Sequence, residues 1–177
     1  PVSVPDSRQQ SLLDGARRQL GRVPNIFATM AHSPALLEGY LGFSKALGGG
    51  SLTAADREAI ALLLAGRNGC DYCAAAHTAI GRAAKIDGAE LTQNLSGRSG
   101  ETKRQALLDF VAELVETTGA VSDGRLAAVR AAGYDDAQVL EAVGHAALNL
   151  FTNSFNRLAG TSVDFPAVTL PAKAAAA

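Results

Sequence analysis

The stretch that organises this sequence is NGCDYCAAAH, residues 68–77, because it contains both cysteines of the 177-residue chain. Cys70 and Cys73 lie three residues apart, and His77 follows four residues after the second cysteine. Side chains at positions i, i+3 and i+7 share one face of a helix, so these three groups project together if the stretch is helical. Two thiols beside an imidazole can close to a disulfide, lose a proton near neutral pH, or bind a metal ion.

A carboxylate can be placed beside this group by helix geometry. Glu58 lies nine residues before Arg67, roughly 13 Å along its helix, and His77 lies roughly 10 Å beyond Cys70. If the Asn68-Gly69 turn folds the two helices antiparallel, Glu58 comes level with His77. A carboxylate fixes the tautomer of an imidazole and supports its protonated form. We therefore predict a proton relay from Glu58 through His77 to Cys73, with Cys70 as the disulfide partner.

The rest of the chain predicts an all-α fold, in which this site lies on a hairpin of two helices. Alternating β-branched runs are missing, and apolar residues recur at three- or four-residue spacing between caps and breakers. Thr53, for example, is a good N-cap with Asp56 three residues later. The expected helices are Ser7–Leu20, Ile26–Ala31, Pro34–Leu47, Thr53–Gly66, Cys70–Lys85, Leu91–Leu95, Glu101–Thr118, Ser122–Ala132 and Asp135–Leu158.

The organisation predicted from these elements is one domain over residues 1–165. It comprises an amino-terminal helical section, residues 1–50, which ends at three consecutive glycines, and a section over residues 51–165 that holds the cysteine motif and the last helices. The alanine- and proline-rich residues 166–177 are expected to form a loose tail. The last helix is apolar around much of its circumference, which favours burial on more than one side and hence a homo-oligomer.

Composition excludes several classes of function. The net charge of −1 provides no basic surface for nucleic acid, and with 5% aromatic residues and no tryptophan few side chains could stack on bases. No apolar run reaches the roughly 20 residues that a membrane span requires. The first residues do not resemble a secretory signal. Two cysteines in a chain of this length are typical of a reducing compartment, so we expect a cytoplasmic protein with neither nucleic acid nor membrane as a partner.

The start of a helix favours thiol reactivity, because its unpaired N–H groups stabilise a thiolate and lower the pKa of the thiol. We predict that Cys73, one turn from His77, attacks the substrate, and that Cys70 is the more exposed cysteine and meets the reductant. Tyr72, Asn68 and His145 are expected to support the site. His145 can line it from another helix or subunit, although a lone histidine in an apolar helix is more often a core residue. The aromatic residues Phe27, Tyr40 and Phe43 are expected in the core.

Other chemistries fit the motif less well. A c-type haem site needs the histidine directly after the second cysteine, and a thioredoxin-like site needs a preceding strand. Zinc remains possible, because Cys70, Cys73 and His77 supply three ligands. A structural zinc site would take a fourth ligand from His32, His145 or Glu58. The cysteines can also be inert small hydrophobic residues, in a helical oligomer without catalysis.

The spacing of Glu58, Cys70, Cys73 and His77 is similar to that in the alkylhydroperoxidase AhpD-like, or carboxymuconolactone decarboxylase-like, superfamily. The segments GRVPNIF (21–27), HSPALL (32–37) and LNLFTNSFN (148–156) resemble its peroxidase-related branch. This resemblance implies an all-α fold that assembles as a dimer, trimer or hexamer. It also implies thiol-dependent reduction of hydroperoxides, in which those four residues form the catalytic set. The decarboxylases of the superfamily lack the cysteine pair.

One position departs from the family pattern. The type member has a second histidine just before the second cysteine, where this chain has Tyr72, which implies a shorter proton relay.

From the motif and the resemblance together we predict a thiol peroxidase with no cofactor or bound metal, which takes a small hydroperoxide and an external dithiol or a thiol-protein reductant. The alternative is a thiol–disulfide oxidoreductase or redox sensor that makes little use of peroxide.

Overall fold

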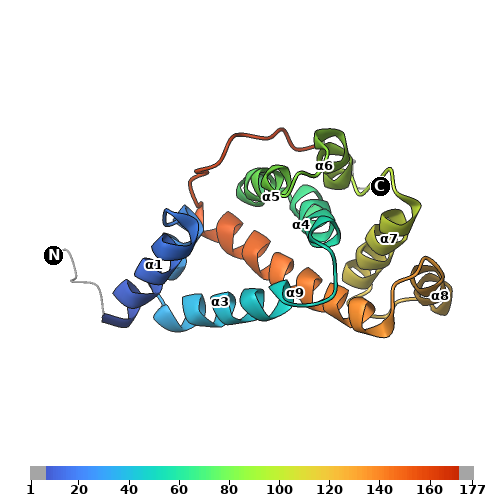
Figure 1. Cartoon of the computed structure of the whole chain (residues 1–177), viewed down its shortest axis with the longest axis horizontal. Helices are drawn as coiled ribbons and strands as arrows, with labels where there is room; N and C mark the ends of the chain where they lie inside the picture. Colours follow the sequence, from blue (N-terminus) through green and yellow to red (C-terminus); the bar gives the residue numbers. More distant parts are fainter. Residues whose placement is uncertain (1–6, 172–177) are drawn as a thin grey trace.

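The computed structural model describes residues 7–171, and every regular element in that range is a helix (Figure 1). The all-α prediction is confirmed. Each helix lies close to its predicted position: the helix predicted at Leu91–Leu95 begins three residues early, and every other boundary lies within two residues of its prediction. The helices are α1 Ser7–Leu20, α2 Asn25–Met30, α3 Pro34–Gly48, α4 Ala54–Asn68, α5 Asp71–Ala83, α6 Gly88–Leu95, α7 Thr102–Glu116, α8 Asp123–Ala131 and α9 Asp136–Ala159.

Helix α4 is the centre of the fold, packed against α5, α6, α7 and α9 (Figure 1). Every residue from 59 to 66 is buried, so α4 contributes side chains to two separate apolar clusters. Ile60 and Leu64 pack with α7, α8 and the first half of α9. Leu62 and Ala65 pack instead with α2, α5 and α6, in the cluster that includes both cysteines. A central helix buried on all sides gives the adjacent α5 a rigid support.

The turn between α4 and α5 requires Gly69. This residue ends α4 in the left-handed conformation, with φ 66° and ψ 44°, a region that glycine occupies without the steric cost of a Cβ. The turn reverses the chain, as the Asn68-Gly69 pair predicts, and sets α5 beside α4. Thr53 caps the other end of α4, because its hydroxyl accepts a hydrogen bond from the Asp56 N–H at 3.1 Å.

Close packing of α4 on α6 depends on Gly66. A Cβ atom at this position would lie 1.9 Å from the carbonyl oxygen of Leu95. Any larger residue must therefore push the two helices apart. Because α5 lies beside both, Gly66 helps to fix the position of the cysteine helix.

A group of charges centred on the buried Arg104 joins α4, α6 and α7. Arg104 Nε donates to Asp56 at 3.3 Å, and its two terminal nitrogens contact Glu90 at 3.1 Å and Glu101 at 3.2 Å. The Tyr134 hydroxyl also donates to Asp56, at 2.9 Å. Asp56 is therefore a structural anchor in addition to its place in the first turn of α4. We refer to these five residues as the Arg104 network.

After α9 the chain continues without helix and crosses over α5 towards α6 (Figure 1). Phe165, Val168 and Leu170 pack against the cluster that contains the cysteines. Residues 166–171 are thus packed on the domain, in contrast to the predicted loose tail, because Val168 and Leu170 turn their side chains to this apolar cluster. Residues 172–177 of that predicted tail lie outside the described residues, and the domain limits stay a prediction. Within residues 7–171, no helix is both long and apolar enough to cross a membrane.

Candidate active site

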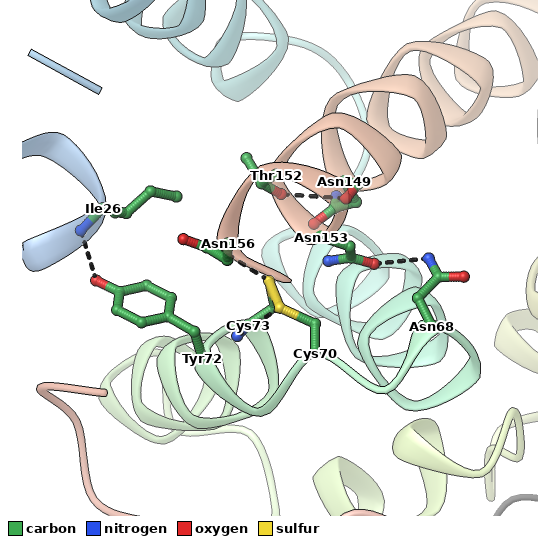
Figure 2. Close-up of a disulfide and its surroundings, with 9 residues drawn as sticks. All are labelled: Ile26, Asn68, Cys70, Tyr72, Cys73, Asn149, Thr152, Asn153 and Asn156. Carbon is green, nitrogen blue, oxygen red and sulfur yellow. Dashed lines mark hydrogen bonds between the residues drawn. A yellow bond between two sulfur atoms is a disulfide. The ribbon is translucent and has the colours of Figure 1, made fainter. Parts of the chain in front are cut away.

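Cys70 and Cys73 form a disulfide at the start of α5, with their Cα atoms 5.3 Å apart (Figure 2). Cys70 is the N-cap of α5, and its sulfur accepts a hydrogen bond from the Cys73 N–H at 3.2 Å. A thiolate at this position would receive the same bond together with the favourable end of the helix dipole. The first turn of α5 therefore both closes the disulfide and stabilises its reduced form.

The two sulfurs differ in access rather than in burial. Cys70 is 1% exposed and Cys73 is 2% exposed, so the prediction that Cys70 is the more exposed cysteine is wrong. As the N-cap, Cys70 lies between the end of α4 and the start of α5 and is enclosed there. Cys73, one turn further, lines a cavity, whereas Cys70 is not among the lining residues. A small molecule can therefore reach the disulfide from the Cys73 side.

Glu58 and His77 meet as the hairpin geometry predicts. The Nδ1 atom of His77 lies 2.8 Å from a carboxylate oxygen of Glu58, and both side chains are largely buried. With Nδ1 held by the carboxylate, Nε2 is the ring nitrogen that remains available to exchange a proton. His77 lines the same cavity as Cys73. The predicted proximity of these groups is confirmed, and their catalytic roles stay a prediction.

The cavity at Cys73 has a volume of about 260 Å³ and is largely apolar. Phe27 and Tyr40, which we expected in the core, form part of its wall, because α2 and α3 turn one edge of their apolar faces to this space. Phe43 is 43% exposed and is not a core residue either. The lining is completed by the end of α1, the turn after it, α2, α5, α9 and the C-terminal segment, with residues Leu20, Arg22, Pro24, Ile26, Tyr72, Ala76, Ile80, Thr152, Asn156 and Phe165.

Tyr72 forms a wall of this cavity and holds other walls in place. Its hydroxyl accepts a hydrogen bond from the Ile26 N–H at 3.3 Å (Figure 2), and its ring packs edge-on against Phe165. Burial raises the pKa of the Tyr72 phenol, and a hydrogen bond to Asp164 raises it further. Asp164 also pairs with Arg22 at 2.8 Å. Tyr72 therefore stays protonated, and it contacts Ile26 and Phe165 at the cavity wall; its support of the site stays a prediction.

Asn156 is a site residue that the sequence reasoning missed. Its amide nitrogen lies 3.4 Å from the Cys73 sulfur and donates to it (Figure 2). Asn68, predicted to support the site, instead donates from its amide to Asn153 at 2.8 Å and so ties the end of α4 to α9. Asn156 lies 83 residues after Cys73, and no local spacing rule connects the two. The only signal was its place in the family-like segment at residues 148–156.

A second cavity, of about 190 Å³, lies on the other side of the Glu58–His77 pair. His145 and Asn149, one turn apart on α9, line this second space. They are not among the residues that line the cavity at Cys73. Burial lowers the pKa of His145, with a further contribution from the nearby Arg57 guanidinium. His145 is therefore a buried neutral residue behind the relay.

Metal ligands are not gathered in the part of the chain that the structure describes. No three side chains from histidine, cysteine, aspartate and glutamate lie close enough together there to hold an ion. His32 lines a separate surface pocket beside α2 and residues 159–162. The zinc alternative therefore has no preformed donor set in residues 7–171.

The comparisons with known proteins agree with this arrangement. The sequence profile of the carboxymuconolactone decarboxylase family matches residues 34–99, which include α3 to α6 and the whole hairpin. A solved protein from Ralstonia eutropha JMP134, described as an alkylhydroperoxidase AhpD core and a peroxidase-related protein, aligns with 92% of this chain and 87% of its own at 26% identity and TM-score 0.81. These matches support the resemblance of the chain to the AhpD-like, or carboxymuconolactone decarboxylase, superfamily and to its peroxidase-related branch.

Two further solved structures share the fold. A peroxidase-related protein from Silicibacter sp. TM1040 aligns at 21% identity and TM-score 0.81, over 92% of this chain and 88% of its own. The debrominase Bmp8 aligns at 18% identity and TM-score 0.73, over 89% of this chain and 87% of its own. A comparison with curated proteins returned no match. The matched family and the Ralstonia structure carry the names of enzymes, which supports an enzymatic role for this chain.

Proposed function

We propose that this AhpD-like protein is a thiol-dependent peroxidase that reduces small hydroperoxides through a Cys70–Cys73 dithiol/disulfide cycle. The observation that carries the proposal is that Cys73 and His77 line one cavity, with His77 held by Glu58 at 2.8 Å. A nucleophile and a proton donor therefore face the same bound molecule, which is the arrangement that cleavage of an O–O bond requires.

The cycle follows from the groups present. The Cys73 thiolate attacks the terminal oxygen of the hydroperoxide, so that a sulfur–oxygen bond forms and the O–O bond breaks. His77 gives a proton to the departing alkoxide, which leaves as an alcohol, and Cys73 is left as a sulfenic acid. The Cys70 thiol then attacks Cys73, water is released and the disulfide forms. An external dithiol or thiol protein returns two electrons and two protons, and the cycle begins again.

The apolar wall of the cavity supports organic hydroperoxides as substrates in preference to hydrogen peroxide. Phe27, Tyr40 and Phe165 offer ring surfaces to a hydrocarbon group, and burying it gains roughly 25 cal/mol for each Å² removed from water. Hydrogen peroxide has no such group. We expect the kcat/KM for cumene hydroperoxide to exceed that for hydrogen peroxide by at least about tenfold, the equivalent of roughly 1.4 kcal/mol.

Steady-state consumption of cumene hydroperoxide with dithiothreitol as reductant tests the proposal. Wild type should turn over, Cys73→Ser should be inactive, and Cys70→Ser should react once and stop. Arg130→Ala, at an exposed position on α8 that is not among the residues lining the cavity, serves as the control that keeps activity. A wild-type rate no higher than that of Cys73→Ser would refute the peroxidase.

Burial of the disulfide bears on the alternative of a thiol–disulfide oxidoreductase. At 1% and 2% exposure the two cysteines offer no sulfur to a folded protein surface, whereas a small dithiol or a slender thiol-bearing segment can enter the cavity. We therefore place disulfide exchange in the regeneration step. Faster turnover with a protein disulfide than with a hydroperoxide would favour the alternative.

A second candidate is reductive removal of halogen from an arene. A variant of the debrominase Bmp8 was solved with 2,3,4-tribromopyrrole and has the same fold, at 17% identity and TM-score 0.73. The aromatic lining beside Cys73 is the feature of this chain that favours it. An aryl bromide and the dithiol would give the arene, the disulfide and hydrogen bromide. Bromide release from a brominated pyrrole, measured beside hydroperoxide consumption, separates the two candidates.

We also propose that the protein is a homo-oligomer. Phe43 on α3 and Leu140 and Val143 on α9 are large apolar side chains with 43%, 71% and 40% of their surface exposed, and α3 packs along α9 (Figure 1). Such exposure on adjoining helices supports an interface. Sedimentation velocity should give a dimer or larger species, and a monomer for Leu140→Glu.

A further inference from the structure

The Asn156 amide is positioned to serve two partners with its two ends. The nitrogen donates to Cys73 at 3.4 Å. The oxygen is buried and accepts no hydrogen bond from another protein group in the described chain. Figure 2 shows this oxygen turned away from the disulfide, and Asn156 lines the cavity that Cys73 and His77 share. A buried amide oxygen without a partner costs free energy, so a ligand that donates to it would relieve that cost.

The orientation of the amide follows from its partner. The sulfur of a disulfide or thiolate offers lone pairs and no proton, so the nitrogen must face it and the oxygen must face away. Asn156 is 4% exposed, on the long helix α9, and its backbone carbonyl closes the helix end by accepting from the N–H of Gly160. Its position is thus fixed by the fold rather than by the substrate.

We propose that Asn156 is a catalytic residue that holds both reacting atoms: its N–H stabilises the Cys73 thiolate, and its oxygen accepts the O–H of a bound hydroperoxide. The oxygen that carries this hydrogen is the one that Cys73 attacks. One amide thereby sets the nucleophile and its target side by side. The alkoxide oxygen is left to His77, so the two side chains divide the two oxygens of the substrate. The ligand class is a molecule with an apolar group and a terminal O–O–H donor.

This assignment rests on the proposed peroxidase function, and the test separates the two. The Cys70→Ser protein contains Cys73 as its only thiol, and serine keeps the N-cap of α5. In this background, Asn156→Ala removes both ends of the amide. Asn156→Asp keeps an oxygen acceptor and removes the donor. Asn153→Ala is the matched control, because Asn153 is a buried amide of the same helix that contacts Asn68 and is not among the residues lining the cavity.

The first readout is the rate of Cys73 alkylation by iodoacetamide against pH, which needs no peroxidase activity. We expect Asn156→Ala and Asn156→Asp to raise the pKa of the Cys73 thiol by about one unit or more, because both variants lose the hydrogen bond that the Asn156 N–H donates to the thiolate. Asn153→Ala should leave it unchanged. Superimposable titration curves for wild-type Asn156 and both variants would overturn the role of the N–H.

The second readout is single-turnover reaction with cumene hydroperoxide at a pH where Cys73 is fully ionised in each protein. There the alkylation rates of Asn156→Ala and its parent should agree within about twofold, whereas the hydroperoxide rate of the variant should stay roughly five- to tenfold lower, the range for one neutral hydrogen bond. Asn156→Asp should recover part of that loss. Equal losses in both reactions would overturn the role of the oxygen. If the parent consumes no hydroperoxide, the peroxidase proposal fails, and the titration alone decides whether Asn156 stabilises the thiolate.

Discussion

Two buried polar regions of this protein are built in opposite ways. In the Arg104 network, each buried charge has several partners: Arg104 contacts three carboxylates, Asp56 also accepts from Tyr134 and Thr53, and Glu90 also accepts from Ser99 and Gly100. Around the disulfide, by contrast, buried polar atoms are left over. The oxygen of Asn156 and the amide nitrogen of Asn153 have no hydrogen-bond partner within the described chain.

The difference teaches what each region is for. A buried polar atom without a partner costs about 1–3 kcal/mol, so a region selected only for stability would pair such atoms. The Arg104 network does so and joins α4, α6 and α7. The region around Cys73 keeps unpaired groups beside the disulfide, and one of them, the Asn156 oxygen, belongs to a residue that lines the cavity, where we propose that a ligand pairs with it. Four predictions test this contrast.

The largest effect is expected in the Arg104 network. Arg104→Ala leaves Asp56 and Glu90 buried without their cation, and we expect the free energy of unfolding to fall by about 3–5 kcal/mol. Arg125 is the matched control, an arginine that contacts Asp109 and Glu113 at a more exposed position. Arg125→Ala should cost less than about 1 kcal/mol. Urea denaturation measures both. Equal losses would mean that burial of the network does not matter.

The second effect is on activity rather than stability. His77→Ala removes the proton donor and should lower kcat/KM for cumene hydroperoxide about 100-fold, the equivalent of about 2.7 kcal/mol in the transition state. Glu58→Gln keeps the shape of the side chain and should lower kcat/KM about tenfold. The His77 ring then keeps a neighbour at residue 58 but loses its negative charge and its fixed orientation. Rates are measured by hydroperoxide consumption. A Glu58→Gln protein with wild-type kinetics would remove Glu58 from the relay.

The third effect is the pH dependence of stability that Glu90 confers. Burial acts to raise its pKa, but hydrogen bonds from the Ser99 hydroxyl, the Gly100 N–H and Arg104 outweigh it and lower the pKa below the ordinary 4.5. The unfolded chain therefore binds this proton first as pH falls. The stabilisation is fully present above the ordinary pKa and is lost as pH falls through the folded value.

Urea denaturation of wild type and Glu90→Gln from pH 7 to pH 3 measures this contribution. The advantage of wild type over the variant should be constant near neutrality and shrink on the acid side. An advantage that stayed constant down to pH 3 would contradict the lowered pKa of Glu90.

The smallest effect is expected at Asn156. Asn156→Leu replaces an amide that makes one hydrogen bond and leaves its oxygen unpaired with an apolar group of similar volume beside an existing cavity. The free energy lost with the hydrogen bond and the free energy gained by removing the unpaired oxygen should nearly cancel. We expect the free energy of unfolding to change by less than about 1 kcal/mol, while hydroperoxide reduction falls. Thermal and urea unfolding of the oxidised protein measure it. A loss as large as that of Arg104→Ala would make Asn156 a structural residue.

The sequence was informative where local geometry decides the outcome. Helix periodicity, the Thr53 cap and the Asn68-Gly69 turn predicted the hairpin, and the rise per residue placed Glu58 beside His77. Asn156 and Phe165 could not be found in this way. They reach the cavity from α9 and the C-terminal segment, more than 70 residues beyond the cysteines, and only the packing of whole helices brings them there.

The same limit explains the errors in burial. The exposure of Cys70 depends on how the end of α4 encloses the start of α5, and the place of Tyr40 depends on which edge of α3 faces the cavity. Asp56 looked like an ordinary first-turn carboxylate, because its partners Arg104 and Tyr134 lie 48 and 78 residues away.

The central claim, that the Cys73 sulfur attacks a hydroperoxide, is tested most directly by trapping the sulfenic acid that this attack forms. Reduced Cys70→Ser and Cys73→Ser proteins are each mixed with one equivalent of cumene hydroperoxide and dimedone, and the labelled residue is identified by mass spectrometry. The account predicts stoichiometric sulfenic acid on Cys73 in Cys70→Ser, with one equivalent of alcohol, and none on Cys70 in Cys73→Ser. Label on Cys70 in Cys73→Ser, or no label in either protein, would contradict it.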